Sequence, residues 1–257
     1  FAFGMKRGNF MGEWFSSHYQ EFLSDFNQSF IEDDRWQYIV KGLGVTITVA
    51  IGALILGVII GVMVAVIRSA HDQRRHKKSK GLGYVILGVL NVICKIYLTV
   101  IRGTPMMVQL LIMYFVIFAS STNTIMVAII AFGINSGAYV AEIIRGGIMS
   151  IDAGQMEAGR SLGLNYIKTM RYIIVPQAIK NILPALGNEM ITLLKDTSLV
   201  TVIGLKDMVK GALIIQGRTY QAFLPLVAVA IIYLIIVIIL SKLLTLLERR
   251  LRESDRR

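Results

Sequence analysis

Two long uncharged stretches constrain this chain more than any other feature of its sequence. Residues 43–67 and 219–241 contain no Asp, Glu, Lys or Arg. A helix needs about 20 mostly apolar residues to cross the roughly 30 Å hydrocarbon core of a bilayer, and both stretches exceed that length. The chain is also 55% hydrophobic, with a mean hydropathy of +0.64, which is too apolar for a soluble domain. We therefore predict an all-helical integral membrane protein.

A third uncharged stretch, residues 103–141, is too long for one crossing. The polar residues 120–123 divide it, so we predict two helices joined by a tight turn. The apolar segment 83–100 comes before this stretch, but it contains Lys95 and leads into Pro105, where a continuous helix is disfavoured. We therefore predict that residues 83–100 form a helical lead-in, partly interfacial, to the second span.

Basic residues cluster beside the apolar stretches and set the expected orientation. The segment 68–80 is rich in Lys and Arg against one acid, Asp72, and the tail 248–257 is rich in Arg. Both should be cytoplasmic, which requires an even number of crossings between them. Five spans meet this condition with the N-terminus outside, although the expected external loop 205–220 is itself basic. The predicted spans are 40–67, 103–119, 124–145, 182–204 and 221–246.

The two ends of the chain are expected to lie outside the bilayer. Residues 1–37 are acidic and lack the continuous apolar core of a secretory signal, so we predict an amphipathic extracytoplasmic segment there. Residues 38–247 form the predicted transmembrane domain, and residues 248–257 form a basic cytoplasmic tail. The net charge of +11 then belongs to loops at the membrane surface and does not indicate nucleic-acid binding.

Helix packing must hold this fold together, because the single cysteine, Cys94, cannot form an intrachain disulfide. Residues 57–61 and 133–137 both begin and end with glycine. Small residues at this spacing allow two membrane helices to approach closely. We predict that both patterns serve helix packing.

The loop 146–181 between the third and fourth spans is expected to be cytoplasmic and is longer than a turn requires. Ser150 or Asp152 can cap a short helix that ends before Gly163, which suits a left-handed stop. Asn165 can cap a second helix that runs to Val175, before Pro176. The sequence therefore predicts two short helices that meet at a glycine.

This loop carries a motif that resembles the cytoplasmic motif of ABC importer permeases. That family has Glu-Ala-Ala, three residues, Gly, nine residues, then Ile, any residue and Leu-Pro. Here the same spacing gives Glu157, Ala158, Gly159 and Gly163, followed by Ile-Ile-Val-Pro at residues 173–176. Gly replaces the second Ala and Val replaces Leu, so the small or apolar character is kept at both positions.

The resemblance implies a division of labour with other subunits. In that family the short helix docks in a groove of a separate nucleotide-binding subunit. We interpret Ala158 and Gly159 as allowing close approach of that partner, and Glu157 as offering a charge to it. The expected assembly has two permeases, of the same or a similar chain, two ATPase subunits and an extracytoplasmic solute-binding protein, in the cytoplasmic (inner) membrane of a bacterium.

The chain itself is expected to have no enzymatic activity. It has no Gly-x4-Gly-Lys-Ser/Thr phosphate loop, so ATP and Mg would be bound by the partner ATPase. We expect this chain to bind no cofactor and no metal. A membrane enzyme is a poor alternative, because the sequence shows no Ser/His/Asp or metal-ligand constellation.

Residues 102–110, 137–147 and 194–200 resemble the polar amino-acid branch of this permease family. Several of them are charges that are costly inside a bilayer unless they are paired or hydrated. One interpretation is that Glu142 and Asp196 accept the ammonium group of an amino acid while Lys195 and Gln109 meet its carboxylate. The complete predicted substrate-binding set is Gln109, Glu142, Lys195, Asp196 and Ser198.

Two alternatives stay open for these charges. Glu142 and Arg145 are three residues apart on the expected helix and can simply pair, while Lys195 or Asp196 can join one helix to another. In a secondary transporter driven by an ion gradient, Glu142 and Asp196 would instead be proton or sodium sites. That alternative leaves the 146–181 motif unexplained.

Overall fold

The computed structural model describes residues 7–76 and 82–253, and their regular elements are all helical. Parts of the predicted N-terminal segment, basic loop and basic tail, residues 1–6, 77–81 and 254–257, lie outside the described residues. The long helices are α1 Arg7–Phe26, α2 Trp36–His76, α3 Leu82–Gly103, α5 Thr124–Met149, α8 Val175–Asp196 and α10 Phe223–Glu253. The shorter α-helices are α4 Met106–Ile112, α6 Ala153–Ser161, α7 Tyr166–Thr169 and α9 Met208–Thr219.

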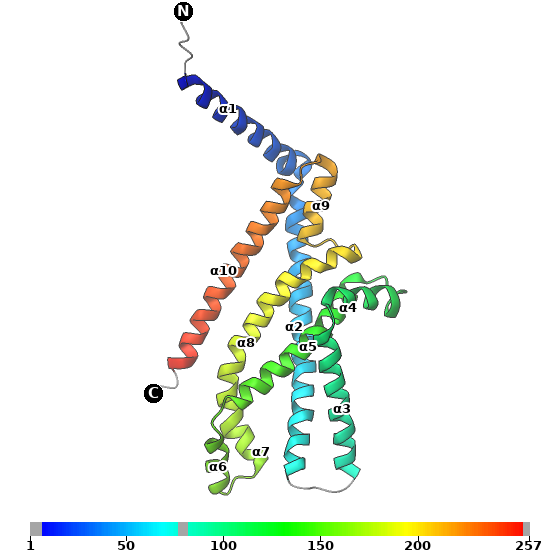
Figure 1. Ribbon diagram of the computed structural model, residues 1–257, viewed down its shortest axis with the longest axis vertical. Coiled ribbons are helices and arrows are strands. Elements are labelled where there is room, and N and C mark those ends of the chain that lie inside the picture. The colour runs from blue at the N-terminus through cyan, green and yellow to red at the C-terminus, as the bar shows by residue number, and fades with distance from the viewer. Residues whose placement is uncertain (1–6, 77–81, 254–257) are drawn as a thin grey trace, which may run out of the picture.

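Five of the long helices run along the longest axis of the molecule in alternating directions (Figure 1). Within the described residues, four helices are long and apolar enough to cross a membrane: α2, α3, α5 and α10. The fifth, α8, has 22 residues but is amphipathic, with Lys180, Glu189 and Lys195 along it. Helices α6 and α7 lie at the same end of the molecule as the C-terminus of α2 (Figure 1).

The most extensive contact between helices in the described residues is between α2 and α5, and glycines on both helices make it possible. Gly57 and Gly61 of α2 face Ser136 and Val140, while Gly133 and Gly137 of α5 face Leu56 and Ile60. A Cβ on Gly61 would lie 2.5 Å from a side-chain carbon of Val140 and 2.9 Å from the backbone nitrogen of Ala141. The predicted packing role of both glycine patterns is therefore confirmed.

The second predicted span, 103–119, is wrong as a helix of span length. Residues 82–103 form a continuous helix of span length, whereas the apolar helical segment Met106–Ile117 is shorter. The two segments are separated at Pro105, which has no amide hydrogen and adopts an extended conformation with ψ 134°. Residues 113–117 complete the second segment as a π-helix.

Packing against α2 shows how these two segments are arranged. Tyr97 and Ile101, near the end of α3, pack in one cluster with Ile60, whereas Leu110 of α4 packs in another with Val49. Helix α3 therefore ends beside the middle of the uncharged stretch of α2. Helix α4 continues from there along α2 toward its N-terminal end, so α3 and α4 together follow α2 in the opposite direction.

Three predicted spans, 40–67, 124–145 and 221–246, coincide with span-length helices that extend beyond the predicted bounds. Helix α2 extends beyond the predicted 40–67 at both ends, α5 extends past residue 145 to Met149, and α10 extends past residue 246. The predicted span 182–204 is an α-helix only to Asp196 and then a 3-10 helix, Thr197–Ile203. The predicted helix end at Pro176 is wrong, because Pro176 lies in the first turn of α8, where a missing amide hydrogen costs little.

The predicted external loop 205–220 contains α9, which packs into the bundle. Met208, Ala212 and Ile215 are buried in a cluster with Ile39 of α2 and Val229 of α10. The N-cap of α9 is Asp207, a fully buried residue that accepts hydrogen bonds from Thr201 Oγ1 and the amides of Val209 and Lys210. Burial raises the pKa of Asp207 above its usual range, and these hydrogen bonds act in the opposite direction.

Substituting alanine at two glycines of α2 tests the packing of α2 on α5. We expect Gly61→Ala to destabilise the fold by about 1–3 kcal/mol, because the new methyl group meets Val140 and the backbone of α5. Gly44→Ala is the matched control, since nothing lies within 4 Å of a Cβ there. It should stabilise α2 by about 0.5–1 kcal/mol. Thermal unfolding of the purified variants measures both changes in stability. Shifts of the unfolding temperature in the same direction for the two variants would contradict this packing.

Candidate functional site

Residues 152–174, here named the hairpin, form two short helical arms whose turns follow from local sequence. Asp152 caps α6 by accepting a 2.7 Å hydrogen bond from the Gly154 amide. Gly163 ends this helix with φ +81°, a conformation that favours glycine. Asn165 then caps α7 by accepting a 2.9 Å bond from the Lys168 amide. The predicted caps at Asp152 and Asn165 and the left-handed stop are confirmed.

The motif residues of the hairpin do not share one environment. Glu157 and Ala158 are exposed on α6, whereas Gly159 is buried. A Cβ on Gly159 would lie 2.5 Å from the Thr169 methyl carbon and 3.0 Å from Ile173. The interpretation that Gly159 allows a partner to approach is therefore wrong, because this glycine faces the other arm of the hairpin.

Large apolar side chains are exposed on the same hairpin. Leu162 is 79% exposed and Ile167 is 71% exposed, and both lie beside the Gly163 turn. An exposed apolar patch rimmed by polar residues commonly marks a protein interaction site. The tip of the hairpin and the exposed arm of α6 therefore form a surface that can bind another protein.

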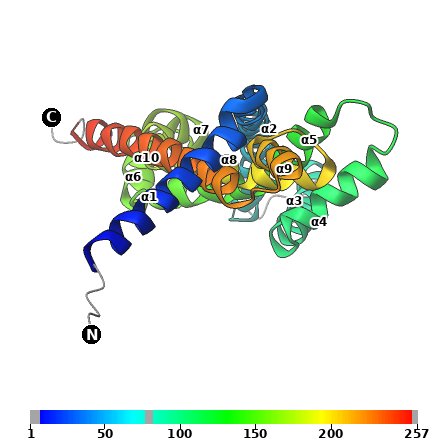
Figure 2. The ribbon, with the colours of Figure 1, turned by 90° about the horizontal axis from the view of Figure 1, so that it is seen from above.

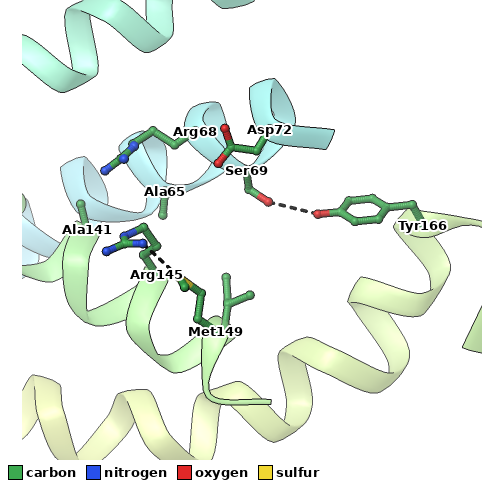
Figure 3. Close-up of a pocket in the computed structure, with 9 residues that line it drawn as sticks. Ala65, Arg68, Ser69, Asp72, Ala141, Arg145, Met149 and Tyr166 are labelled. Carbon is green, nitrogen blue, oxygen red and sulfur yellow. Dashed lines mark hydrogen bonds between the residues drawn. The ribbon is translucent and has the colours of Figure 1, made fainter. Parts of the chain in front are cut away.

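One polar contact attaches the hairpin to α2, and a second joins α8 to the end of α5 at the base of the hairpin. The Tyr166 hydroxyl and Ser69 Oγ of α2 lie 3.2 Å apart in hydrogen-bond contact, across a pocket of about 260 Å³ (Figure 3). On the other side, Asn181 Nδ2 of α8 donates a 2.8 Å bond to Ser150 Oγ, just after α5. The hairpin is thus connected with α2 through a side chain and with α5 and α8 through its two ends.

Glu142 binds arginines from three helices. Its carboxylate lies 3.0 Å from Arg68 of α2, 3.1 Å from Arg145 of α5 and 3.9 Å from Arg102 of α3. The pairing with Arg145 that the sequence left open is present, and the contributions of Arg68 and Arg102 were not predicted. Lys95, Arg68, Arg102 and Glu142 line an open cavity of about 480 Å³. Three cationic side chains therefore surround one carboxylate there.

Gln109 bridges the break between α3 and α4. Its Nε2 donates to the carbonyl oxygens of Ile101, at 2.8 Å, and Thr104, at 3.1 Å. Its Oε1 accepts a 3.0 Å bond from Asn135 of α5. The side chain therefore satisfies carbonyl groups that Pro105 leaves without a helical donor and ties the break to α5.

The acidic residues of α8 lie at two different levels of the bundle. Glu189 Oε1 accepts a 2.7 Å bond from Ser136 of α5, which lies against Gly57 in the middle of α2. Asp196 is half-buried and lies at the end of α8. Lys195 is exposed and, with Ser198 and Tyr233, lines a cavity of about 290 Å³ between α8 and α10.

The predicted substrate-binding residues therefore do not form one site within a single chain. Glu142 pairs with Arg68, whereas Val200, just after Asp196 in the chain, packs in a cluster with Val49 of α2. Nineteen residues of helix separate Val49 from Arg68, which is roughly 28 Å along α2. The polar residues Asn135 and Ser136, which sequence reasoning missed, lie between these levels; their signal was two adjacent polar residues in an uncharged span.

A pair of substitutions tests the contact inside the hairpin. Gly159→Ala should loosen the hairpin, because the clash with the Thr169 methyl costs about 1–3 kcal/mol, against about 1 kcal/mol gained in helix propensity. Adding Thr169→Ser removes that methyl and keeps the hydroxyl, so the double variant should recover. The rate of tryptic cleavage after the exposed Arg160 reports hairpin opening; a double variant that is cleaved as fast as the single one would contradict this contact.

Comparison with known proteins places this geometry in a family. Residues 79–253 match the family model described as binding-protein-dependent transport system inner membrane component. The Bacillus subtilis arginine transport system permease protein ArtQ is 37% identical, over 85% of this chain and 94% of its own length. The Escherichia coli glutamine transport system permease protein GlnP is 35% identical, over 83% of this chain and 93% of its own.

Solved structures of similar fold are also ABC transporters. A crystal structure of an amino acid ABC transporter with histidines has 41% identity and a TM-score of 0.74, covering 83% of this chain and 94% of its own. The methionine ABC transporter MetNI, in an inward-facing conformation, has 17% identity and a TM-score of 0.69, which shows a shared fold. The chain belongs to the family of binding-protein-dependent transport system inner membrane components.

Proposed function

We propose that this chain is the permease subunit of an ATP-driven importer that moves polar amino acids into the cell by alternating access. The capped hairpin carries this proposal, because it presents Glu157 and Ala158 on an exposed helix and buries Gly159 behind them. The relatives named for arginine and glutamine transport support the substrate class. Their names identify no single substrate for this chain.

The proposed topology has five crossings, with the N-terminus outside and the C-terminus in the cytoplasm. The crossings are α2, α3 followed by α4, α5, α8 and α10. Counting α3 and α4 as one crossing keeps an even number between the two basic segments, as the positive-inside rule requires. The break at Pro105 is tolerated inside the membrane because Gln109 satisfies the carbonyls it frees.

Force would enter through the hairpin and reach the membrane helices by two routes. Tyr166 contacts Ser69 of α2, and the chain stays helical from Tyr166 through residues 170–174 into α8. Two ATPase subunits, which would hold ATP and Mg, would dock on the exposed arm of the hairpin. A second permease, of the same or a similar chain, and an extracytoplasmic solute-binding protein would complete the importer in the bacterial inner membrane.

Substrate contacts are proposed for residues that keep an accessible group in the structure. Lys195 and Ser198 line the cavity between α8 and α10, so they can meet a carboxylate. Asp196, next to Lys195, can meet an ammonium group. Gln109 and Glu142 also belong to the substrate-binding set predicted from sequence, but both already have partners. Gln109 binds the α3–α4 break and Glu142 binds three arginines, so each would need to exchange its partners for substrate.

Reversing one charge on the hairpin tests the proposed function. With reconstituted ATPase subunits and solute-binding protein, uptake of radiolabelled amino acid into vesicles should require ATP. Glu157→Lys should reduce both ATPase binding and uptake by about tenfold or more, since a lost charge-assisted contact is worth about 1.5–3 kcal/mol. Membrane insertion should be unchanged, because Glu157 is exposed and outside the long helices.

The control for this variant is Glu248→Lys, which makes the same charge change on α10, outside the hairpin. It should retain ATPase binding and uptake. Normal uptake by Glu157→Lys would remove the docking role. Uptake that follows an ion gradient without any ATPase subunit would overturn the importer proposal and favour a secondary transporter.

Neutralising Asp196 tests the proposed substrate contact. Asp196→Asn keeps the shape of the side chain and removes its charge, so uptake of a cationic amino acid should fall more than uptake of a neutral one. Glu21→Gln removes one acidic charge from the exposed polar face of α1 and should change neither. The test is to measure KM and maximal rate for both substrates in the unmodified chain, Asp196→Asn and Glu21→Gln. Equal kinetics in all three proteins would leave Asp196 with a purely structural role.

A further inference from the structure

Helix α1 presents a continuous aromatic face that the rest of the described chain does not cover. Phe15, Tyr19, Phe22 and Phe26 recur at the spacing of one helix face, and all four are exposed. Gln20 and Ser24 lie on the opposite face and are also exposed. A helix of this kind needs an apolar surface on one side and water on the other.

The C-terminal end of α1 is fixed at the end of the bundle where α10 begins. Gln221 Nε2, just before Phe223 starts α10, donates a 2.9 Å hydrogen bond to Asp25. The rings of Phe26 and Phe30 lie 5.0 Å apart, and Phe30 is buried in a cluster with Val229 of α10. Because α10 is apolar from its first turn, this attachment places the end of α1 at the level where the membrane begins.

From this attachment α1 extends to the same side of the molecule as α10 (Figures 1 and 2). Helix α10 is the least buried of the span-length helices, so most of its apolar surface is left uncovered by the described chain. Phe223 and Leu226 at its start are exposed. The aromatic face of α1 therefore adjoins an uncovered apolar surface that begins on α10.

We propose that α1 is an interfacial helix that lies on the membrane surface at the N-terminal end of α2, with its aromatic face among lipid headgroups and upper acyl chains. Aromatic residues are enriched at this depth, where a ring is buried and polar groups stay wet. Helix α1 carries the acids Glu13, Glu21 and Asp25 against one base, Arg7, so apolar burial, and not attraction to anionic lipid, holds the helix. The family match begins at residue 79, so α1 lies outside it.

A pair of spin labels on opposite faces of α1 tests this proposal in the full chain. Phe22→Cys and Gln20→Cys are each made in a Cys94→Ala background, labelled and reconstituted in phosphatidylcholine vesicles. The label at position 22 should be more accessible to oxygen than to a water-soluble nickel complex, at a depth of about 5–10 Å below the headgroup boundary. The label at position 20 should show the reverse, and adding anionic lipid should change neither.

Other occupants of the aromatic face give different results and would overturn the proposal. A label at position 22 that is as accessible to nickel as the one at position 20 means that α1 projects into water. Protection of position 22 from both reagents means that protein covers the face, and dipolar broadening between labels would identify a second copy of this chain.

Discussion

The close contact of α2 and α5 is the constraint on which the rest of the structure depends. In lipid no hydrophobic effect drives helices together, so association relies on close packing and on hydrogen bonds between helices. Glycines at positions 57, 61, 133 and 137 allow the two backbones to approach. The same approach aligns Ser136 with Glu189 of α8 and Glu142 with Arg68, so the polar contacts of the bundle follow from this packing.

A second constraint is that every backbone polar group in a membrane needs a partner. The chain breaks at Pro105, beside the middle of the uncharged part of α2, and the carbonyls of Ile101 and Thr104 would be left without a helical donor. Gln109 supplies both hydrogen bonds and passes the connection to Asn135. A residue assigned to substrate from sequence thus has a structural role that explains why a polar amide is placed there.

Local signals were predictable from sequence, and contacts between distant segments were not. Asp152, Gly163 and Asn165 set the hairpin because a cap or a left-handed glycine acts within a few residues. Residues 83–100 were predicted as a helical lead-in because a separate crossing there would put the basic tail outside, yet they form most of a span-length helix, in which the long Lys95 side chain reaches a polar cavity with Arg102. Arg68 could not be assigned to Glu142, because that pairing requires the packing of α2 on α5.

The burial of Gly159 changes what the motif means physically. A glycine that faced a partner would help only when the partner is bound. Gly159 instead faces Thr169 and Ile173 on the other arm, so the two arms of the hairpin pack together without any partner. If an ATPase subunit docks there as we propose, a preformed hairpin loses little conformational entropy, so more of the contact energy would remain for moving the attached helices. In that proposal α2 would respond through the Tyr166–Ser69 contact, and α8 through the helical chain that continues from the hairpin into it.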